Sequence, residues 1–432
     1  MNLSPRSYWL VVLIVVLGIL GQWGWDELNS LWRLLAAALL LGLILEGLLA
    51  RNQPLHMQRR LPAAASLGRP LRYQLQVTNP MDQSLLLQSM ETLPALSAEL
   101  PAVMHWQVDS GDTLEQSCQV TPTHLGQLNW QTVQLRLRGR LGLAWWSRRL
   151  HLPDAIPVIP DRLQASEYKK AATERQGDIT RRISGSGHEL LGLREYRYGD
   201  PLHFIDWKAT ARSGKPTVRL FSDEQRLELI LAIDAGRTSA MQAGSLTRLG
   251  HYTNVAARLA EKAMHNGDQV SLVVFADEVT HQLKGLRGHP GLQTLRTTLQ
   301  SLKSIPRESN PLAGILQIRN LASHRSLVVL LTDLDDGDAA DQLVKAMSLL
   351  RPKHQPVLAA ICDRDTLELQ QQPAKEWAAP YHSLAASEMI QNWEHTRYKL
   401  QRLGVPVVFA TVDHLDHQVL ASYDQMKIRH RI

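Results

Sequence analysis

Five of the titratable side chains in one short segment, residues 187–212, are candidates for a metal or acid–base site: His188, Glu189, Asp200, His203 and Asp206. Histidine and carboxylate groups can hold a metal ion or transfer protons, so this group could act in hydrolysis. The spacing matches no metal motif such as H-E-x-x-H. A metal-dependent hydrolase that uses His188, Asp200, His203 and Asp206 is therefore the alternative hypothesis and not the favoured one.

The same segment mixes charges of both signs with residues suited to packing. The basic members include Arg194, Arg197, Lys208 and Arg212, and the packing residues are Leu193, Tyr196, Phe204, Ile205 and Trp207. Such a mixture is typical of a segment held by ion pairs and aromatic contacts. Gly199-Asp200-Pro201 indicates a turn. We therefore favour a structural or partner-contact role for the segment over catalysis.

Two further carboxylates follow predicted strands in the C-terminal half of the chain. Asp234 comes after the apolar residues 227–233, and Asp333 follows the apolar run 326–331. An α/β sheet binds ligands at the carboxyl ends of its strands, so both side chains are candidates for a binding site. The alternative is that they cap the helices that follow.

The elements that must position these carboxylates alternate between strand and helix. Strands are predicted at 227–233, 269–275, 326–331, 357–361 and 405–412, and helices at 247–265, 312–322, 339–350 and 387–403. This alternation predicts a doubly wound α/β domain over residues 227–432.

Two apolar runs lie within the first fifty residues. Residues 8–25 carry no charge and residues 34–50 carry only Glu46, so each run can cross a bilayer. Residues 1–52 are therefore predicted to form a transmembrane helical hairpin, whose short connection holds Asp26, Glu27 and Arg33. Basic residues flank the two runs at Arg6, Arg51, Arg59 and Arg60. They favour the cytoplasmic side of the membrane, so both termini and the soluble domains are predicted to be cytoplasmic. A cleaved signal peptide is the alternative, but no small-x-small site follows the first run.

Short alternating segments separated by Gly and Pro follow the hairpin. Apolar and polar residues alternate at 71–78 and 133–138, and shorter segments at 85–87, 106–108 and 118–120 repeat the pattern. Residues 53–160 are therefore predicted to form a small β-sandwich. Residues 161–226 are assigned to an exposed linker at 161–187 and the charged segment described above.

The charge balance indicates no nucleic-acid partner. The 432 residues include 47 basic and 41 acidic side chains, a formal net charge of +6. No arginine-rich tract or basic-aromatic platform is present, and attraction to an anionic leaflet accounts for the excess. A lipid or nucleic-acid surface binder, whose binding would fall steeply with salt, is a weaker hypothesis. Cys118 and Cys362 suggest no disulfide framework, as expected in a reducing compartment.

Residues 187–212 resemble the signature of the prokaryotic family known as domain of unknown function number fifty-eight. The pattern G-x-E-x-x-x-L-R-x-Y-x-x-G-D-x-x-x-x-I-D-W-x-x-x-A-R is matched at every fixed place. The likeness extends over nearly the whole chain. It implies a protein of the bacterial inner (cytoplasmic) membrane and a MoxR-type AAA+ ATPase as partner. The candidate family or partner-contact residues are Glu189, Arg194, Tyr196, Gly199, Asp200, Asp206, Trp207 and Arg212.

The strand ends resemble the von Willebrand factor A-type domain and its metal-ion-dependent adhesion site. In that family, an Asp-x-Ser-x-Ser loop, a Thr from a second loop and an Asp from a third hold Mg²⁺ through oxygen atoms. The matching residues here are Asp234, Thr238, Ser309 and Asp333. Gly236 replaces one Ser, and Arg237 adds a cation. The resemblance therefore implies a degenerate site with weakened Mg²⁺ binding.

These features predict a membrane-anchored, non-enzymatic adaptor or scaffold whose A-like domain binds protein partners. A MoxR-type ATPase would supply the work, in envelope or complex maturation. No P-loop, catalytic triad, nucleophile elbow or zinc signature supports an enzyme. On this hypothesis Asp333→Ala weakens partner binding and leaves the fold intact.

Overall fold

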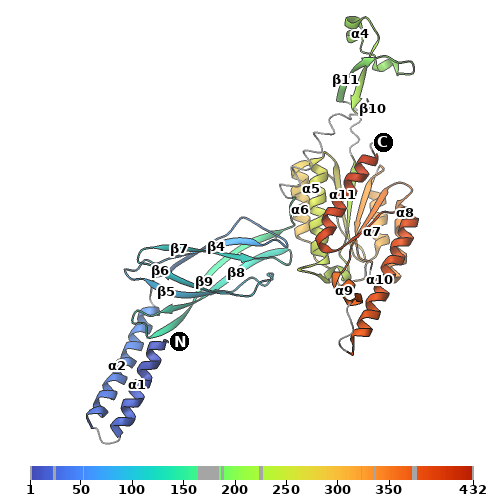
Figure 1. Cartoon of the computed structure of the whole chain (residues 1–432). Coiled ribbons are helices and arrows are strands. Elements are labelled where there is room, and N and C mark those ends of the chain that lie inside the picture. Colours follow the sequence, from blue (N-terminus) through green and yellow to red (C-terminus); the bar gives the residue numbers. More distant parts are fainter. Residues whose placement is uncertain are drawn as a thin grey trace. The chain divides into compact units, whose positions relative to one another are not determined.

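The chain folds as a multidomain protein with two compact units, Met1–Ile159 and Pro160–Ile432. The computed structural model describes residues 2–22, 26–51, 53–163, 184–185, 189–222, 227–322, 324–334, 337–371 and 377–430. Figure 1 shows two helices and β sheets in the first unit and a sheet covered by helices in the second.

Two helices begin the first unit: α1 spans Pro5–Gln22 and α2 spans Asp26–Arg51. Both are long and apolar enough to cross a membrane. Large apolar side chains such as Leu13, Val15 and Leu40 are exposed along them, as expected for a surface that contacts lipid. Asp26, Glu27 and Arg33 belong to α2, so their predicted place in the connection is wrong.

Two sheets complete the first unit. One has the order β1-β9-β8-β5-β6, with β3 paired in parallel to β9, and the other has the order β2-β4-β7. The strands are β1 Asn2–Leu3, β2 His56–Arg60, β3 Ala65–Ser66, β4 Leu71–Thr78, β5 Leu85–Glu91, β6 Val103–Val108, β7 Thr113–Val120, β8 Gly126–Arg138 and β9 Ala144–Ile159. Alternation buries Tyr73, Leu75 and Val77 on one face of β4. The strand segments predicted from alternation at 71–78, 85–87, 106–108, 118–120 and 133–138 all lie within these strands.

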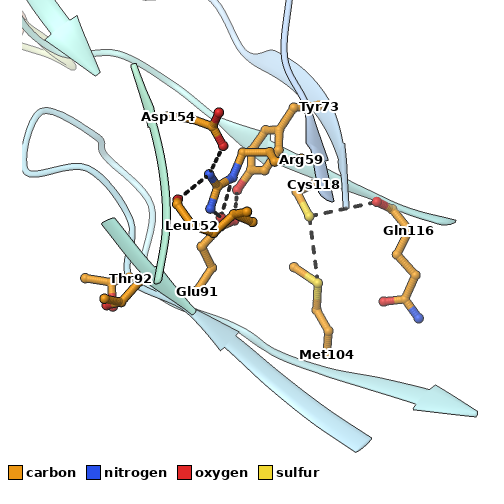
Figure 2. A network of polar contacts seen from close by, with 10 residues as sticks. Arg59, Tyr73, Glu91, Thr92, Met104, Gln116, Cys118, Leu152 and Asp154 are labelled. Carbon is orange, nitrogen blue, oxygen red and sulfur yellow. Dashed lines mark hydrogen bonds and ion pairs between the residues drawn. The ribbon is translucent and has the colours of Figure 1, made fainter. Parts of the chain in front are cut away.

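A buried ionic network joins these two sheets (Figure 2). Arg59 on β2 forms ion pairs with Glu91 on β5 and with Asp154 on β9, and the Tyr73 hydroxyl on β4 donates to Glu91. The Arg59 guanidinium also lies 5.4 Å from the Trp130 ring centre. A buried guanidinium is tolerated only with such partners. The network therefore ties the sheets together through charge as well as apolar packing.

Cys118 on β7 lies beside this network (Figure 2). Its sulfur is 3.7 Å from the Met104 sulfur, and its side chain is buried. Burial, followed by the nearby charge of Glu91, raises the pKa of the Cys118 thiol to about 11.

We predict that Cys118 is unreactive in the folded protein. In a Cys362→Ala variant, Cys118 is the remaining thiol, and dithiobis(nitrobenzoate) should react with it at least about 100-fold more slowly in the native than in the denatured protein. The reason is that a rise in pKa from 9.0 to about 11 lowers the thiolate fraction by this factor near neutral pH. Equal rates in the two states would contradict the burial of Cys118.

Loss of the Glu91 carboxylate should destabilise the first unit. Glu91→Ala leaves the Arg59 guanidinium buried with fewer partners, at an expected cost of about 3–5 kcal/mol. Glu115→Ala is the matched control, because Glu115 pairs with Arg60 on the surface, where an ion pair contributes up to about 1 kcal/mol. The rate at which Cys118 becomes accessible in the native protein measures both effects. Equal acceleration in the two variants would contradict a stabilising role for the buried network.

A six-stranded sheet forms the core of the second unit, in the order β17-β16-β13-β18-β19-β20. Its parallel strands are β13 Glu228–Asp234, β16 Gln269–Phe275, β18 Leu327–Leu331, β19 Gln355–Ile361 and β20 Val407–Ala410, and β17 Val279–Leu286 is an antiparallel edge strand. β13 and β18 are buried on both faces, which explains their continuous apolar sequences.

Helices cover both faces of this sheet (Figure 1). One face packs against α5 Arg248–His265, α6 Gly288–Gln300 and α11 Val412–His430. The other packs against α7 Pro311–Leu321, α8 Gly337–Leu350, α9 Arg364–Gln371 and α10 Ala379–Arg402. The predicted α/β alternation is therefore present, and β17, α6, α9 and α11 are additional to it.

A small antiparallel sheet precedes the α/β sheet in the chain. It comprises β10 Ser184–Gly185, β11 Glu189–Glu195 and β12 Thr217–Ser222, with the short helix η1 Leu202–Phe204 and α4 Trp207–Ser213 between β11 and β12. Another short helix, η2 Arg237–Ala240, and the strand pair β14 Gln242–Ala243 and β15 Leu246–Thr247 lie before α5.

Most of the predicted linker, residues 164–183 and 186–187, lies outside the described residues. Its beginning is bound to α5: the Asp161 and Leu163 N–H groups donate to Asn254 and Glu261 side chains at 2.8 and 3.0 Å. Asp161 is therefore buried, although an exposed connection was predicted here.

Candidate functional site

Residues 189–222, here called the signature subdomain, contain all eight candidate contact residues. Asp206 is the N-cap residue of α4, where its Oδ1 accepts the Lys208 and Ala209 N–H groups, each at 3.0 Å. Its Oδ2 accepts the Arg219 Nε–H of β12 at 2.9 Å. The Ala209 N–H and then Arg219 hold the pKa of Asp206 below its usual value. Asp206 thus fixes the start of the helix to the sheet.

Asp200 fixes the turn of the signature subdomain in a similar way. Both oxygens of its carboxylate accept from Arg194 at 2.7 Å, and its Oδ2 also accepts the Arg197 N–H at 2.8 Å. The preceding Gly199 has φ +103°, a conformation that favours glycine. Arg194, and then the Arg197 N–H, lower the pKa of Asp200. The bidentate pair holds the turn in one geometry.

Four of the outward-facing residues of the signature subdomain are large and apolar. Tyr198 is 104% exposed and Trp207 70%, with Leu202 and Leu193 also exposed. The prediction that Leu193 and Trp207 pack within the segment is therefore wrong for the described part of the chain, whereas Tyr196 is half-buried. Exposed apolar groups on a small rigid frame are typical of an interaction surface. We call these four exposed residues the apolar surface.

The remaining candidates of this segment do not assemble into a metal or acid–base centre. His203 is exposed and lies against Phe204, with ring centres 4.1 Å apart, and Arg212 is exposed in the last turn of α4. Glu189 begins β11, and His188 lies outside the described residues. Among the residues that the structure describes, no group of three or more His, Cys, Asp or Glu could hold a metal ion.

A second polar cluster lies at the carboxyl ends of β13 and β18. The buried Asp234 accepts the Ser309 and Thr332 hydroxyl groups at 2.6 Å each on Oδ2, and the Gly236 N–H at 2.9 Å on Oδ1. Burial raises the pKa of Asp234, and these three hydrogen bonds oppose that effect. Asp234 and Ser309 therefore do meet. Thr332 was not among the residues predicted for this cluster, although a hydroxyl directly before Asp333 was a usable signal.

Asp333 has different partners, which come from α5. Its Oδ1 accepts the Tyr252 hydroxyl at 2.6 Å and lies 3.1 Å from the Arg248 Nη1. The Arg248 and Asp333 side chains are only 5% and 4% exposed. Burial, and then the charge of Asp333, raises the pKa of Tyr252. The guanidinium thus provides a positive charge beside Asp333 within the fold.

These residues do not fit a Mg²⁺ site. Gly236 has no side-chain oxygen, and a Cβ there would lie 3.1 Å from both the Asp234 Oδ1 and the Ser309 Cβ. Thr238 lies in η2, half-buried, and is not one of the three donors to Asp234. Arg237 pairs with Glu308 at 2.9 Å on the surface. Because Arg248 already neutralises Asp333, the cluster serves to hold the loops together.

The buried pairing changes the expectation for Asp333→Ala, which the sequence predicted to leave the fold intact. Removal of this carboxylate leaves Arg248 buried and should destabilise the α/β domain by about 3–5 kcal/mol. Addition of Arg248→Met should recover part of that loss, since no buried charge then remains unpaired.

Cys362, buried after β19, reports this change through its accessibility to thiol reagent in a Cys118→Ala background. Asp341→Ala is the control, because Asp341 pairs with Lys399 on the surface. An effect of Asp333→Ala no larger than that of the control would refute a stabilising Asp333–Arg248 pair.

The fold is that of a protein with apolar N-terminal helices, a β-rich domain and an α/β domain. The signature subdomain and the strand-end cluster are its two candidate functional sites. Residues 192–376 match the family described as "Protein of unknown function DUF58", so this part of the chain has the family character that the signature predicted. No curated protein matches the chain.

Similar solved structures cover only about a quarter of the chain. The CARDB domain of the PF1109 protein from Pyrococcus furiosus is 10% identical, with 24% of this chain and 92% of that chain covered and a TM-score of 0.20. A FixG-related protein from Vibrio parahaemolyticus is 14% identical, with 24% and 96% covered and a TM-score of 0.18. Scores this low support no conclusion about fold or function.

Proposed function

We propose that this protein is a membrane-anchored, non-enzymatic adaptor that offers its signature subdomain to a protein partner. The observation that carries the proposal is the exposure of Trp207 and Tyr198 on a frame whose carboxylates are bound to arginine. Aromatic side chains contribute most to protein interfaces when they are held on a rigid support. The apolar surface has that character, and Asp200 and Asp206 supply the rigidity.

The proposed partner is a MoxR-type AAA+ ATPase, which the family resemblance implies. The ATPase would supply the work, and the chain would hold it at the membrane or present a client to it, in envelope or complex maturation. The two apolar helices support an anchor in the inner membrane. The flanking arginines favour soluble domains in the cytoplasm.

We also propose that the α/β domain is von Willebrand factor A-like. Support comes from the meeting of Asp234, the Ser309 loop and Thr332 at one edge of a mostly parallel sheet. With Gly236 and Arg248 in this cluster, partner binding would not require Mg²⁺. The adaptor would then recognise its partner through apolar contacts rather than a metal bridge.

The test is a comparison of exposed aromatic residues in the full-length protein. Trp207→Ala and Tyr198→Ala should each weaken binding to the MoxR-type ATPase of the same organism at least about tenfold, as truncation of interface aromatics does. Tyr398→Ala is the matched control, since Tyr398 is an exposed aromatic residue on α10, and its affinity should stay unchanged.

Thiol protection of Cys118 and Cys362 verifies that the variants remain folded. Unchanged affinity in both signature variants would refute the apolar surface as the contact. Failure of the wild-type chain to bind the ATPase would refute the partner itself.

A further inference from the structure

The turn between β8 and β9, residues 139–143, binds the beginning of α1. We call this turn the β8–β9 tip. β1 pairs with β9 in the register Asn2–Trp145 and Leu3–Ala144. The Ser4 N–H then donates to the Leu143 carbonyl at 2.8 Å, and the Ser7 hydroxyl donates to the same oxygen. The first turn of α1 is therefore attached directly to the tip.

The same tip packs along α2. The buried Glu46 accepts the Leu143 N–H at 3.2 Å. A Cβ on Gly139 would lie 1.8 Å from the Glu46 Oε1, so glycine is required for this approach. A Cβ on Gly47 would lie 2.6 Å from the Trp146 ring.

Further along α2, a Cβ on Gly42 would lie 3.1 Å from the Leu143 Cδ1 and 3.9 Å from the Leu141 Cδ1. The tip and the first residues of β9 thus lie beside α2 from Gly42 to Gly47.

These contacts place the tip at the level of the apolar spans. A Cβ on Gly18 of α1 would lie 3.7 Å from the Trp32 ring of α2, which sets the level of one antiparallel helix against the other. Counting along both helices from this contact puts Gly42 level with Tyr8. Both residues lie inside the candidate spans, Pro5–Gln22 and Ser30–Ala50. At 1.5 Å per residue, Gly42 is about 12 Å from the end of the second span, so a bilayer boundary at the tip leaves residues 43–50 of α2 beside the sheets, among and beyond the lipid headgroups.

The chemistry of the tip matches the boundary of a bilayer. Leu141 is 60% exposed although it is apolar, and Arg140 beside it is exposed. Trp145 and Trp146 follow at the start of β9, half-buried. Leucine favours the acyl chains, tryptophan the interface, and arginine the lipid phosphates. The exposed tip is continuous with the lipid-facing surface of α1 and α2.

We propose that the β8–β9 tip is a third membrane contact, in which Leu141 enters the acyl-chain boundary and Arg140 binds lipid phosphate groups. The β sheets of the first unit are then joined to the two membrane helices through β1 and the end of α2, and they meet the lipid directly at the tip. A sheet domain joined only by the linker after α2 could rotate, whereas this arrangement fixes its orientation to the bilayer.

Site-directed spin labelling of the full-length protein tests this contact. Single cysteines at Leu141, Arg140, Val12 and Asn129, in a Cys118→Ala, Cys362→Ala background, carry a nitroxide in vesicles of phosphatidylcholine and phosphatidylglycerol. Collision with O₂, which concentrates in lipid, is compared with collision with an aqueous nickel chelate. Val12 lies on α1 and reports helix insertion, and the exposed Asn129 lies on β8 away from the tip.

The expected result is a lipid-type ratio at Leu141→Cys and Val12→Cys, an intermediate ratio at Arg140→Cys, and a water-type ratio at Asn129→Cys. Water-type ratios at both Leu141→Cys and Arg140→Cys, with Val12→Cys in lipid, would overturn the proposal while the helices remain inserted. A water-type ratio at Val12→Cys would overturn it by removing the anchor. None of these outcomes depends on the adaptor function.

Discussion

Arginine–carboxylate pairing is the interaction on which the geometry of the β-sheet domain, the signature subdomain and the α/β domain depends. In each of these parts an acidic residue is bound to a guanidinium from another segment of the chain. The pairs are Glu91 with Arg59, Asp333 with Arg248, Asp200 with Arg194, and Asp206 with Arg219. Removal of charges from water is costly, and only close pairing repays the cost. Acids that would otherwise suggest catalysis or metal binding therefore serve to fix geometry.

This use of acidic residues has a consequence for function. When Asp200 and Asp206 are occupied in holding the signature subdomain, the groups left to meet a partner include the exposed apolar surface beside basic side chains such as Arg197 and Arg212. In the strand-end cluster the charge of Asp333 is likewise balanced within the fold. Arg248 supplies the positive charge that a bound cation would supply in a metal-dependent site. Recognition by an exposed apolar surface is thus consistent with how the charges of both clusters are satisfied.

Part of the fold and of the two candidate sites could be predicted from the sequence, and part could not. Continuous apolar runs revealed β13, β16 and β18, and the carboxylate after β13 indicated where the loops meet. The edge strand β17 alternates half-buried and exposed residues, and α11 is largely polar, so neither gives a strong pattern. The Asp333–Arg248 pair joins residues far apart in the chain and has no local spacing. Trp207 was expected to pack because an aromatic residue in a core and one at an interface look alike in sequence.

Amide hydrogen exchange of the full-length protein in lipid nanodiscs, with and without the MoxR-type ATPase, would locate the partner contact on the chain. The proposed contact predicts new protection within residues 189–222, with the loops at 234–238, 307–310 and 332–334 unchanged. Protection confined to those loops, with none in residues 189–222, would contradict it and identify the strand-end cluster as the binding surface.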